Sequence, residues 1–284
     1  MENSFLFFFY MMVECCKNNF DAYNGDNREY NRKPRKGRKV VMNYFRKKEN
    51  KNERNNDRSV ILNANTPFHV KEAYKTLRTN IMFSLPEEGC KVIAVTSPLP
   101  NEGKSTTILN LAITFSQTGN RVLLIDGDMR RTNTKRMVPC DTDVGLSDIL
   151  AHFVKLEDAI EQSEYENFSI IYSGNIPPNP AELLSGEYMR HIIEILKEQY
   201  DYIFIDMPPI NVVTDAAVVS SLAHGVILVV RHNISHKDEL KEAVNRMRFV
   251  NAKLLGVVLN DKKLQTKQSY MRYGKYNRYK NYYE

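Results

Sequence analysis

Four consecutive residues, Gly103, Lys104, Ser105 and Thr106, are of the types that hold the phosphates of a nucleotide. They follow a β-branched apolar run over 91–96, which predicts a strand, and they open an apolar stretch that predicts a helix. A Gly-Lys-Ser turn between a strand and a helix is typical of a Walker A loop, in which backbone N–H groups bind phosphate oxygens. The lysine would neutralise the β- and γ-phosphates, the serine hydroxyl would bind Mg²⁺, and the threonine would hydrogen-bond the α-phosphate.

Two residues of this loop depart from the strict motif. Pro98 stands where the motif has its first glycine, and Asn101 stands where a glycine would ease a left-handed turn. Asparagine tolerates that backbone conformation better than most residues do. A chance Gly-Lys-Ser in a loop is the alternative, but the strand before it and the helix after it favour nucleotide binding.

Acidic residues follow two further apolar runs. Asp126 and Asp128 come after the run 122–125, and Asp206 comes after the run 202–205. The second is a Walker B arrangement, in which the carboxylate holds Mg²⁺ directly or through water. Residues two apart in an extended segment point to one side, so Asp126 and Asp128 could both face the γ-phosphate. A lone aspartate after a strand is often only a helix cap or a turn former, but three beside a phosphate loop favour phosphoryl transfer.

The elements that must position these residues alternate along the chain. Short β-branched runs predict strands buried on both faces, and longer segments with helical periodicity separate most of them. This alternation predicts an α/β fold, a doubly wound and mostly parallel sheet of the P-loop NTPase type, whose strand ends bind ligands. The predicted strands are 91–96, 122–125, 169–172, 202–205, 226–230 and 254–259, and the predicted helices lie near 70–83, 104–118, 187–199, 214–223 and 236–249.

Charge and composition divide the 284 residues into three parts. Residues 1–60 carry a formal charge of +6 and residues 261–284 carry +5, which leaves −5 for residues 61–260. Asparagine and charged residues dominate the first part, a composition that does not support a core. We therefore expect a P-loop domain over 61–262, preceded by a basic, disordered extension and followed by a flexible tail over 263–284.

No feature of the N-terminal part predicts secretion or membrane insertion. The apolar run 5–13 is about half the length that spans a bilayer, and it has neither a preceding basic segment nor a following cleavage site. Met42 opens a stretch that would serve equally well as a start, so we hypothesise that residues 1–41 are absent from the natural protein. The four cysteines have neither metal nor disulfide spacing, which fits a reducing cytoplasm.

The last fifteen residues contain six tyrosines set among lysine, arginine, asparagine and glycine. A segment this polar cannot bury its rings. On composition alone, such a tail also fits stacking on RNA bases or residence at a membrane surface. The six are Tyr270, Tyr273, Tyr276, Tyr279, Tyr282 and Tyr283.

Four stretches taken together resemble the bacterial tyrosine kinases (BY-kinases) that control capsule and exopolysaccharide synthesis. They are PNEGKSTT, LLIDGDMRR, IFIDMPP and the terminal tyrosines, and the similarity covers the chain from about position 68 onward. The resemblance implies a non-specific protein-tyrosine kinase that uses ATP and Mg²⁺, with Lys104, Asp126 and Asp128 in catalysis and Ser105 and Asp206 at the metal. It also implies that the six tail tyrosines are autophosphorylated in trans within an oligomer.

A further stretch is similar to the ExxRxxR oligomerisation motif of that family. Glu72, Lys75 and Arg78 lie three residues apart, so they are expected to share a helix face with which a neighbouring subunit could pair. Lys75 replaces the first arginine of the motif and lacks its planar fork, which changes the contact it can make. Met207 is another departure, because the family commonly has Ser or Thr after the Walker B aspartate.

The resemblance also implies the kinase's partners and its place in the cell. They are a ring of copies of the same chain, a transmembrane polysaccharide co-polymerase that acts as modulator, and a cognate tyrosine phosphatase. The kinase itself would be cytoplasmic and recruited to the inner face of the plasma membrane through the modulator.

Three other functions compete with this interpretation. A partition or septum-positioning ATPase shares the fold and the Walker motifs, but such proteins carry a lysine where Leu99 stands here, and the septum type ends in an amphipathic membrane helix. A nucleic-acid-binding module would use the basic ends, but the net acidic body supplies no continuous basic groove, so no nucleic-acid partner is expected. An inactive scaffold whose nucleotide only holds an oligomer together is the third.

Overall fold

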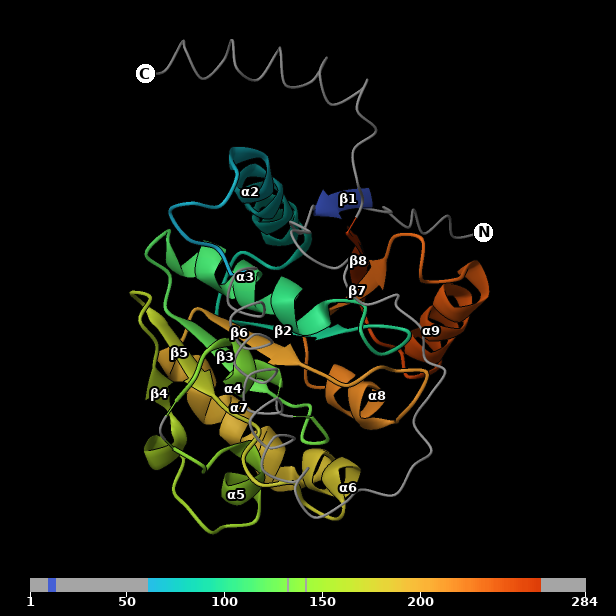
Figure 1. Cartoon of the computed structure of the whole chain (residues 1–284). Helices are drawn as coiled ribbons and strands as arrows, with labels where there is room; N and C mark the ends of the chain where they lie inside the picture. Colours follow the sequence, from blue (N-terminus) through green and yellow to red (C-terminus); the bar gives the residue numbers. More distant parts are fainter. Residues whose placement is uncertain (1–9, 14–60, 132, 141, 262–284) are drawn as a thin grey trace, which may run out of the picture.

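The computed structural model describes residues 10–13, 61–131, 133–140 and 142–261 (Figure 1). The expectations for the tyrosine-rich tail and for most of the N-terminal extension lie outside the described residues. Within them the predicted fold class is confirmed, because a mostly parallel sheet is covered by helices on both faces.

The described sheet has eight strands in the order β1-β8-β7-β2-β6-β3-β5-β4. All neighbours are parallel except β4 and β5, which form an antiparallel pair. The strands are β1 (Tyr10–Val13), β2 (Lys91–Thr96), β3 (Val122–Asp126), β4 (Glu161–Gln162), β5 (Phe168–Ile171), β6 (Tyr202–Asp206), β7 (Gly225–Arg231) and β8 (Leu254–Asn260).

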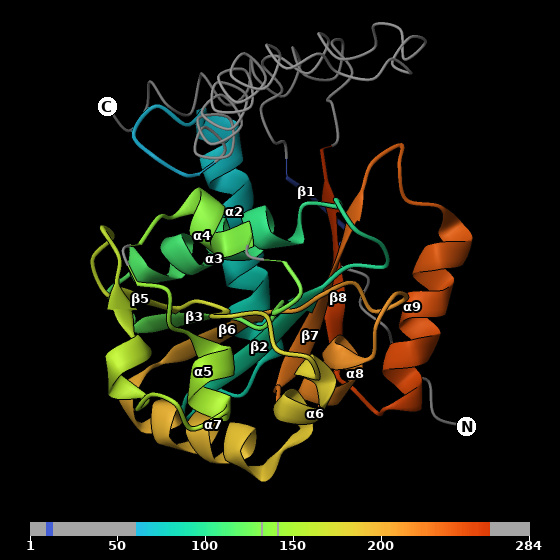
Figure 2. The ribbon, with the colours of Figure 1, turned by 60° about the horizontal axis from the view of Figure 1, so that its bottom comes forward.

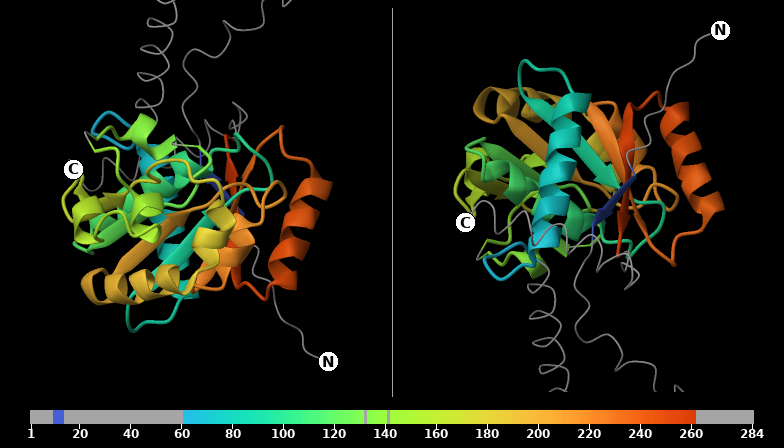
Figure 3. Two further views of the ribbon diagram at one scale, coloured as in Figure 1. Left: turned by 90° about the horizontal axis from the view of Figure 1, so that it is seen from below. Right: turned by 90° about the horizontal axis from the view of Figure 1, so that it is seen from above.

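Helices connect the strands and cover the two faces of the sheet. Figure 1 shows α2 and α3 above the sheet and α7 below it, and Figures 2 and 3 show α9 beside the β7 and β8 end. Within 61–261, with the gaps given above, no helix has both the length and the apolar composition needed to span a membrane. The helices are α2 (Phe68–Ser84), α3 (Lys104–Ser116), α4 (Asn133–Met137), α5 (Leu146–Leu150), α6 (Pro180–Ser185), α7 (Glu187–Gln199), α8 (Asp215–Ser220) and α9 (Lys237–Phe249), with a short 3₁₀ turn, η1 (Glu157–Ala159).

Each central strand contributes side chains to two separate hydrophobic clusters. In β3, Val122 and Leu124 pack into the cluster that contains α2 and α3, while Leu123 and Ile125 pack into the cluster that contains α5 to α9. Alternate residues of a strand point to opposite faces, so burial of both faces requires apolar residues at consecutive positions. This requirement explains why the central strands could be predicted as unbroken β-branched runs.

The order in which the strands are connected places three strand ends together. The chain leaves β2 through α3 and joins the sheet again at β3, two places away, and β6 later fills the gap between them. From β6 the chain passes through α8 to β7, on the other side of β2. The pairing register sets Asp206 opposite Val95 on one side and opposite Asp126 on the other. Ligands of open α/β sheets bind at such a reversal of strand order.

The N-terminal extension differs from its prediction at one place. Residues 1–60 were expected to lack structure, but Tyr10–Val13 forms a strand that pairs in parallel with β8, so the prediction was wrong for these four residues. The physical reason is that β8 would otherwise be the edge of the sheet, and its unpaired backbone groups are a template for a further apolar strand.

An aromatic group fixes the packing of α3 against the sheet. The Phe115 ring centroid lies 4.4 Å from that of Tyr202 and 5.3 Å from that of Phe204, and Phe115 is fully buried. Because Phe115 belongs to the last turns of α3, this contact holds the end of the helix that begins at the phosphate loop.

We expect Phe115→Ala to lower the free energy of unfolding by about 3–5 kcal/mol, because it leaves a cavity where the ring was packed. Urea denaturation followed by circular dichroism measures this loss. Phe249→Ala is the matched control, since that ring is 89% exposed and its removal should change stability by less than about 0.5 kcal/mol. An equal effect of the two substitutions would contradict the packing argument.

Candidate functional site

The loop between β2 and α3 is closed by a residue from the far edge of the described domain. Gly103 and Asn101 both have left-handed backbone conformations, with φ of 88° and 65°. The Asn260 side-chain amide donates to the Glu102 carbonyl oxygen at 3.1 Å. A Cβ atom on Gly103 would lie only 1.9 Å from Asn260 Nδ2, so glycine is required here for its space as well as for its φ. Asn260 therefore closes this loop by a hydrogen bond and by filling the space beside Gly103.

Glu102 holds the same loop from inside, a role that the sequence did not reveal. Its side chain is buried, and one carboxylate oxygen accepts a hydrogen bond from the Leu99 backbone N–H at 2.9 Å. The other oxygen accepts a hydrogen bond from the Ser235 hydroxyl. Burial raises the pKa of Glu102, although both hydrogen bonds oppose this rise. The contact spans 133 residues of sequence, so no local pattern indicates it.

Lys104 lies between two of the predicted acidic residues. Its ammonium nitrogen is 3.0 Å from Asp128 Oδ2 and 3.4 Å from Asp206 Oδ1, and all three side chains are almost fully buried. Ser105 Oγ is 3.4 Å from the same nitrogen. The fold therefore brings together residues that are 24 and 102 positions apart, as the predicted strand ends required.

The two paired aspartates differ in their position at the site. Asp128 is among the residues that line the cavity and Asp126 is not, although both side chains are almost fully buried. That both carboxylates face the γ-phosphate stays a prediction; β3 ends at Asp126, and Asp128 already belongs to the following loop. The two remain in contact, since the Asp128 backbone N–H donates to Asp126 Oδ1 at 3.2 Å.

The buried charges perturb each other strongly. Burial, and then the nearby Asp206 carboxylate, raises the pKa of Asp126 to about 8, and Lys104 only partly offsets this. Burial likewise raises the pKa of Asp206. Burial alone would lower the pKa of Lys104, but the carboxylates of Asp206 and Asp128 outweigh it and raise that pKa. One lysine thus does not neutralise the three carboxyl groups, and the site favours a further cation.

The donor atoms suit a magnesium ion bound together with phosphate. Asp126 Oδ2, Asp128 Oδ1 and Asp206 Oδ2 are buried and have no hydrogen-bond partner in the described part of the chain. No group of three or more His, Cys, Asp or Glu side chains within that part could hold a metal ion by itself. Mg²⁺ commonly takes only one or two carboxylates and completes its shell with water and phosphate oxygens. The Ser105 hydroxyl and the Asp206 carboxylate fit that pattern.

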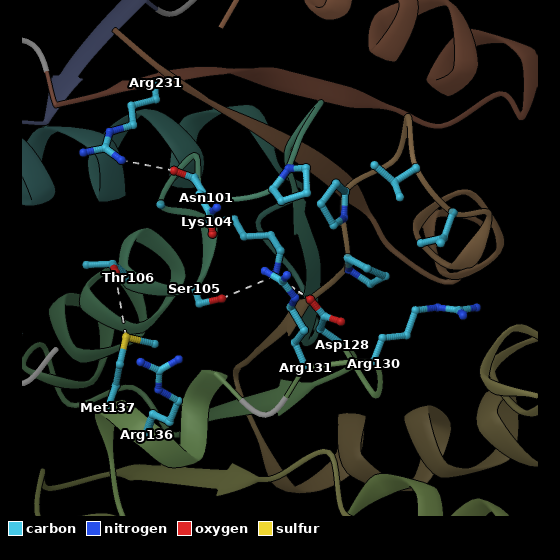
Figure 4. A pocket seen from close by; sticks show the side chains of 16 residues that line it. Asn101, Lys104, Ser105, Thr106, Asp128, Arg130, Arg131, Arg136, Met137 and Arg231 are labelled. Carbon is cyan, nitrogen blue, oxygen red and sulfur yellow. Dashed lines mark hydrogen bonds and ion pairs between the residues drawn. The ribbon is translucent and has the colours of Figure 1, made fainter. Parts of the chain in front are cut away.

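A cavity of about 550 Å³ opens above these residues (Figure 4). Its volume lies in the range of small-molecule sites. Lys104 and four arginines line it against a single aspartate, so the lining attracts an anion of high charge. Gly103, Ser105 and Thr106 form its loop side, and the arginines are Arg130, Arg131, Arg136 and Arg231.

Two of the arginines are fixed by contacts that the sequence did not predict. Arg130 binds Asp215 with two hydrogen bonds, of 2.9 and 3.0 Å, and Asp215 is fully buried. Arg231 binds Asp261 at 2.9 Å and also donates to the Asn101 carbonyl oxygen at 3.3 Å. The double arginine after the first acidic motif, Arg130 and Arg131, was the one signal available in the sequence. Its partner lies 85 residues away and is recognisable only in the fold.

The residues expected to mediate oligomerisation lie on α2, away from the cavity lining. Lys75 is exposed, Glu72 is half-buried, and the two pair with each other at 2.7 Å. Arg78 donates to the Thr114 carbonyl oxygen of α3 at 2.7 Å, so within this subunit it serves packing between the two helices. The six tail tyrosines lie outside the described residues.

Comparison with known proteins connects this site to one family. The sequence model of a family described as AAA domain matches residues 90–260. Tyrosine-protein kinase YwqD of Bacillus subtilis is 38% identical over 203 residues, which are 72% of this chain and 86% of the relative. The crystal structure of the chimerical protein CapA2B2 is similar, with a TM-score of 0.68 and 35% identity over 71% of this chain and 88% of that chain.

The fold itself is shared more widely. The septum site-determining protein MinD from Pyrococcus horikoshii OT3, solved with Mg-ADP, has a TM-score of 0.53 and 28% identity. This similarity covers 60% of the chain and 70% of MinD. The match is weaker than that to the kinases, so sequence and structure both separate this chain from the septum-positioning ATPases.

The perturbed carboxyl group gives a prediction about stability. In the unfolded chain the pKa of Asp126 is about 4, and in the folded protein it is about 8. Between these values the folded protein keeps a proton that the unfolded chain has lost, so the free energy of unfolding falls as pH rises from about 4 to 8. Asp126→Asn removes this dependence. The free energy of unfolding of Asp126→Asn, minus that of wild type, should therefore increase by a few kcal/mol between pH 5 and pH 8.

Urea denaturation without nucleotide at the two pH values measures the difference. Asp158→Asn, at an exposed position, is the control and should follow the wild type at both. A difference in the free energy of unfolding between Asp126→Asn and wild type that is the same at both pH values would contradict the raised pKa of Asp126.

Proposed function

The chain belongs to the bacterial tyrosine-protein kinases, and on that premise we propose that it transfers the γ-phosphate of ATP to the tyrosines of its own C-terminal tail. The observation that carries the proposal is the buried group of Lys104, Asp128 and Asp206 beneath an arginine-lined cavity. The phosphorylated tail would in turn regulate capsular or exopolysaccharide synthesis.

The phosphate loop is assigned to the nucleotide. Gly103, Lys104, Ser105 and Thr106 line the cavity at the start of α3, where free backbone N–H groups attract phosphate. Mg²⁺, when bound, would neutralise charge on the β- and γ-phosphates, and Ser105 and Asp206 are the residues that would hold it. The orphaned carboxylate oxygens described above support this assignment.

The transfer step breaks one bond and forms one. The phenolic oxygen of a tyrosine attacks the γ-phosphorus while the bond from that phosphorus to the β,γ-bridging oxygen breaks, and ADP leaves with the electron pair. The phenolic proton passes to the pair Asp126 and Asp128. Asp128, at the cavity wall, orients the phenol, and Asp126 behind it has a pKa of about 8, closer to the phenol's value of about 10 than an ordinary carboxylate.

The acceptor tyrosines are assigned to the tail because the described body offers none that is exposed. The side chains of all six tyrosines in 61–261 are buried or half-buried there. Tyr74 and Tyr172, for example, are 2% and 4% exposed, and Tyr172 donates to the Val138 carbonyl oxygen. The tail instead offers six acceptors among polar residues. Each phosphate adds about −1.5 to −2 charge, so several would reverse the sign of the tail.

Assembly is proposed on the residues of α2. The exposed Lys75 and the half-buried Glu72 could exchange partners with a neighbouring subunit in a ring, while Arg78 would first have to release the Thr114 carbonyl oxygen. In such a ring each tail would reach the site of another copy. A transmembrane modulator would recruit the ring to the inner face of the plasma membrane, and a cognate phosphatase would reverse the reaction.

Lys104→Met tests the assignment of the buried lysine. We expect tyrosine autophosphorylation to fall by about 100-fold or more, because the buried cation under the phosphates is lost. The measurement is phosphotyrosine formed by the purified chain with ATP, Mg²⁺ and the cytoplasmic segment of the modulator. Lys241→Met, on the exposed face of α9, should behave as wild type. Absence of phosphotyrosine in wild type, or its persistence in a folded Lys104→Met protein, would refute the proposal.

Replacement of all six tail tyrosines by phenylalanine tests the acceptor. Most labelling should disappear while binding of a fluorescent ATP analogue stays within about threefold of wild type, because the cavity is unchanged. The matched control replaces Tyr23, Tyr30 and Tyr44, which lie near the other end of the chain, and should keep its labelling. Labelling that persists in the six-residue variant would mean that the tail assignment is wrong.

A mixture of the two variants separates transfer within a subunit from transfer between subunits. The six-residue variant has an intact site and no tail acceptor, and Lys104→Met has a tail and no active site. Labelling of the Lys104→Met tail in the mixture is expected, and its absence would restrict the reaction to a subunit's own tail.

A further inference from the structure

The four arginines of the cavity are not equivalent. Arg130 is held by Asp215, and Arg231 is held by Asp261 and by the Asn101 carbonyl oxygen. Arg136 also interacts with a neighbouring group. The bonds to Asp215 and Asp261 fix the guanidinium groups of Arg130 and Arg231 to the protein.

Arg131 differs from the other three. Its side chain is exposed and lines the cavity, and its guanidinium has no hydrogen bond or ion pair with any residue that the structure describes. Its backbone is fixed, because the Arg131 N–H donates to the Asp128 carbonyl oxygen at 3.0 Å. In Figure 4 its side chain extends toward Lys104 and Ser105, whereas that of Arg130 points away from them. The backbone therefore holds Arg131, whose guanidinium has no partner among the described residues, close to Asp128 in the lining of the cavity.

The charge balance of the site calls for such a cation. The transition state of phosphoryl transfer spreads negative charge over three oxygens of the transferred group. Lys104 shares its charge with Asp128 and Asp206, and the loop before it, residues 97–103, contains no other lysine or arginine. Without Arg131, only carboxylates would face the transferred group from the side of β3 and β6. An added positive charge on that side stabilises the transition state more than the ground state.

We propose that Arg131 is a catalytic residue, which contacts the γ-phosphoryl group during its transfer to tyrosine. The inference rests on the proposed function. Arg130 is a positioning residue for it, because its two bonds to the buried Asp215 fix the chain one residue before Arg131. The planar guanidinium can donate two parallel hydrogen bonds to phosphate oxygens, which the ammonium group of a lysine cannot do.

Two substitutions at this position test the proposal. Arg131→Ala should lower the rate of tyrosine autophosphorylation by about 100- to 1000-fold, as loss of a transition-state arginine does, while the Kd for ATP stays within about threefold. Arg131→Lys should recover only part of the rate, because it keeps the charge and loses the fork. Arg248→Ala, at an exposed position of α9, is the control and should match wild type.

A second measurement does not depend on catalysis. ADP with Mg²⁺ and aluminium fluoride mimics the transition state of phosphoryl transfer. Wild type should bind ADP more tightly when aluminium fluoride is present than with Mg²⁺ alone. Arg131→Ala should lose most of that difference and bind ADP as wild type does.

The outcomes separate this inference from the function on which it rests. Wild type that forms no phosphotyrosine would refute the proposed function. Active wild type with Arg131→Ala equally active and equally able to bind aluminium fluoride would overturn the role of Arg131. A loss of ATP affinity as large as the loss of rate would also overturn it, because Arg131 would then serve substrate binding alone.

Discussion

One constraint governs the site: three carboxyl groups and a single lysine are buried together at the ends of adjacent strands. The pairing register of β3 with β6 sets Asp126 directly opposite Asp206, so their repulsion is built into the sheet and cannot be relieved without moving a strand. Lys104 reaches this group because α3 begins at that residue. The fold therefore gathers three carboxyl groups around one lysine at the point where the order of its strands reverses, and a bound Mg²⁺ could replace the proton that Asp126 keeps there.

The phosphate loop is held by contacts that cross the sheet, and its shape does not come from its own sequence alone. Asn260 at the end of β8 bonds the Glu102 carbonyl oxygen and fills the space beside Gly103, while Ser235 bonds the Glu102 carboxylate. These groups come from segments on the far side of β2. The position of the phosphate loop thus depends on the packing of β7 and β8. Strands that do not border the loop in the sequence are therefore still needed to hold it in place.

Much of this architecture was predictable because burial of both faces leaves a strong signal in the sequence. The strands that form the centre of the sheet are continuous apolar runs, and the strand-to-helix turn at Lys104 follows one of them. The short elements β4, α4, α5 and α6 were not predicted, since β4 has only two residues and a helix of five or six residues makes fewer than two turns, too few to show a helical period. The partners of Glu102, Arg130 and Arg231 could not be predicted either, because each pair meets only after the chain has folded. The reach of Asp128 into the cavity, without Asp126, depends on where β3 ends.

The residue that closes the phosphate loop also lies just before the tail. Asn260 bonds the loop, and the next residue, Asp261, binds Arg231, which in turn bonds the loop at Asn101. The tail of residues 263–284 therefore follows directly on a segment held at the rim of its own subunit's site, and a fully extended chain of that length spans no more than about 80 Å. The effective concentration of the tail at nearby sites would then depend on its length and not on the total protein concentration. Tyrosines at different positions along the tail lie different numbers of residues from position 261, so the order in which they are phosphorylated would depend on that number.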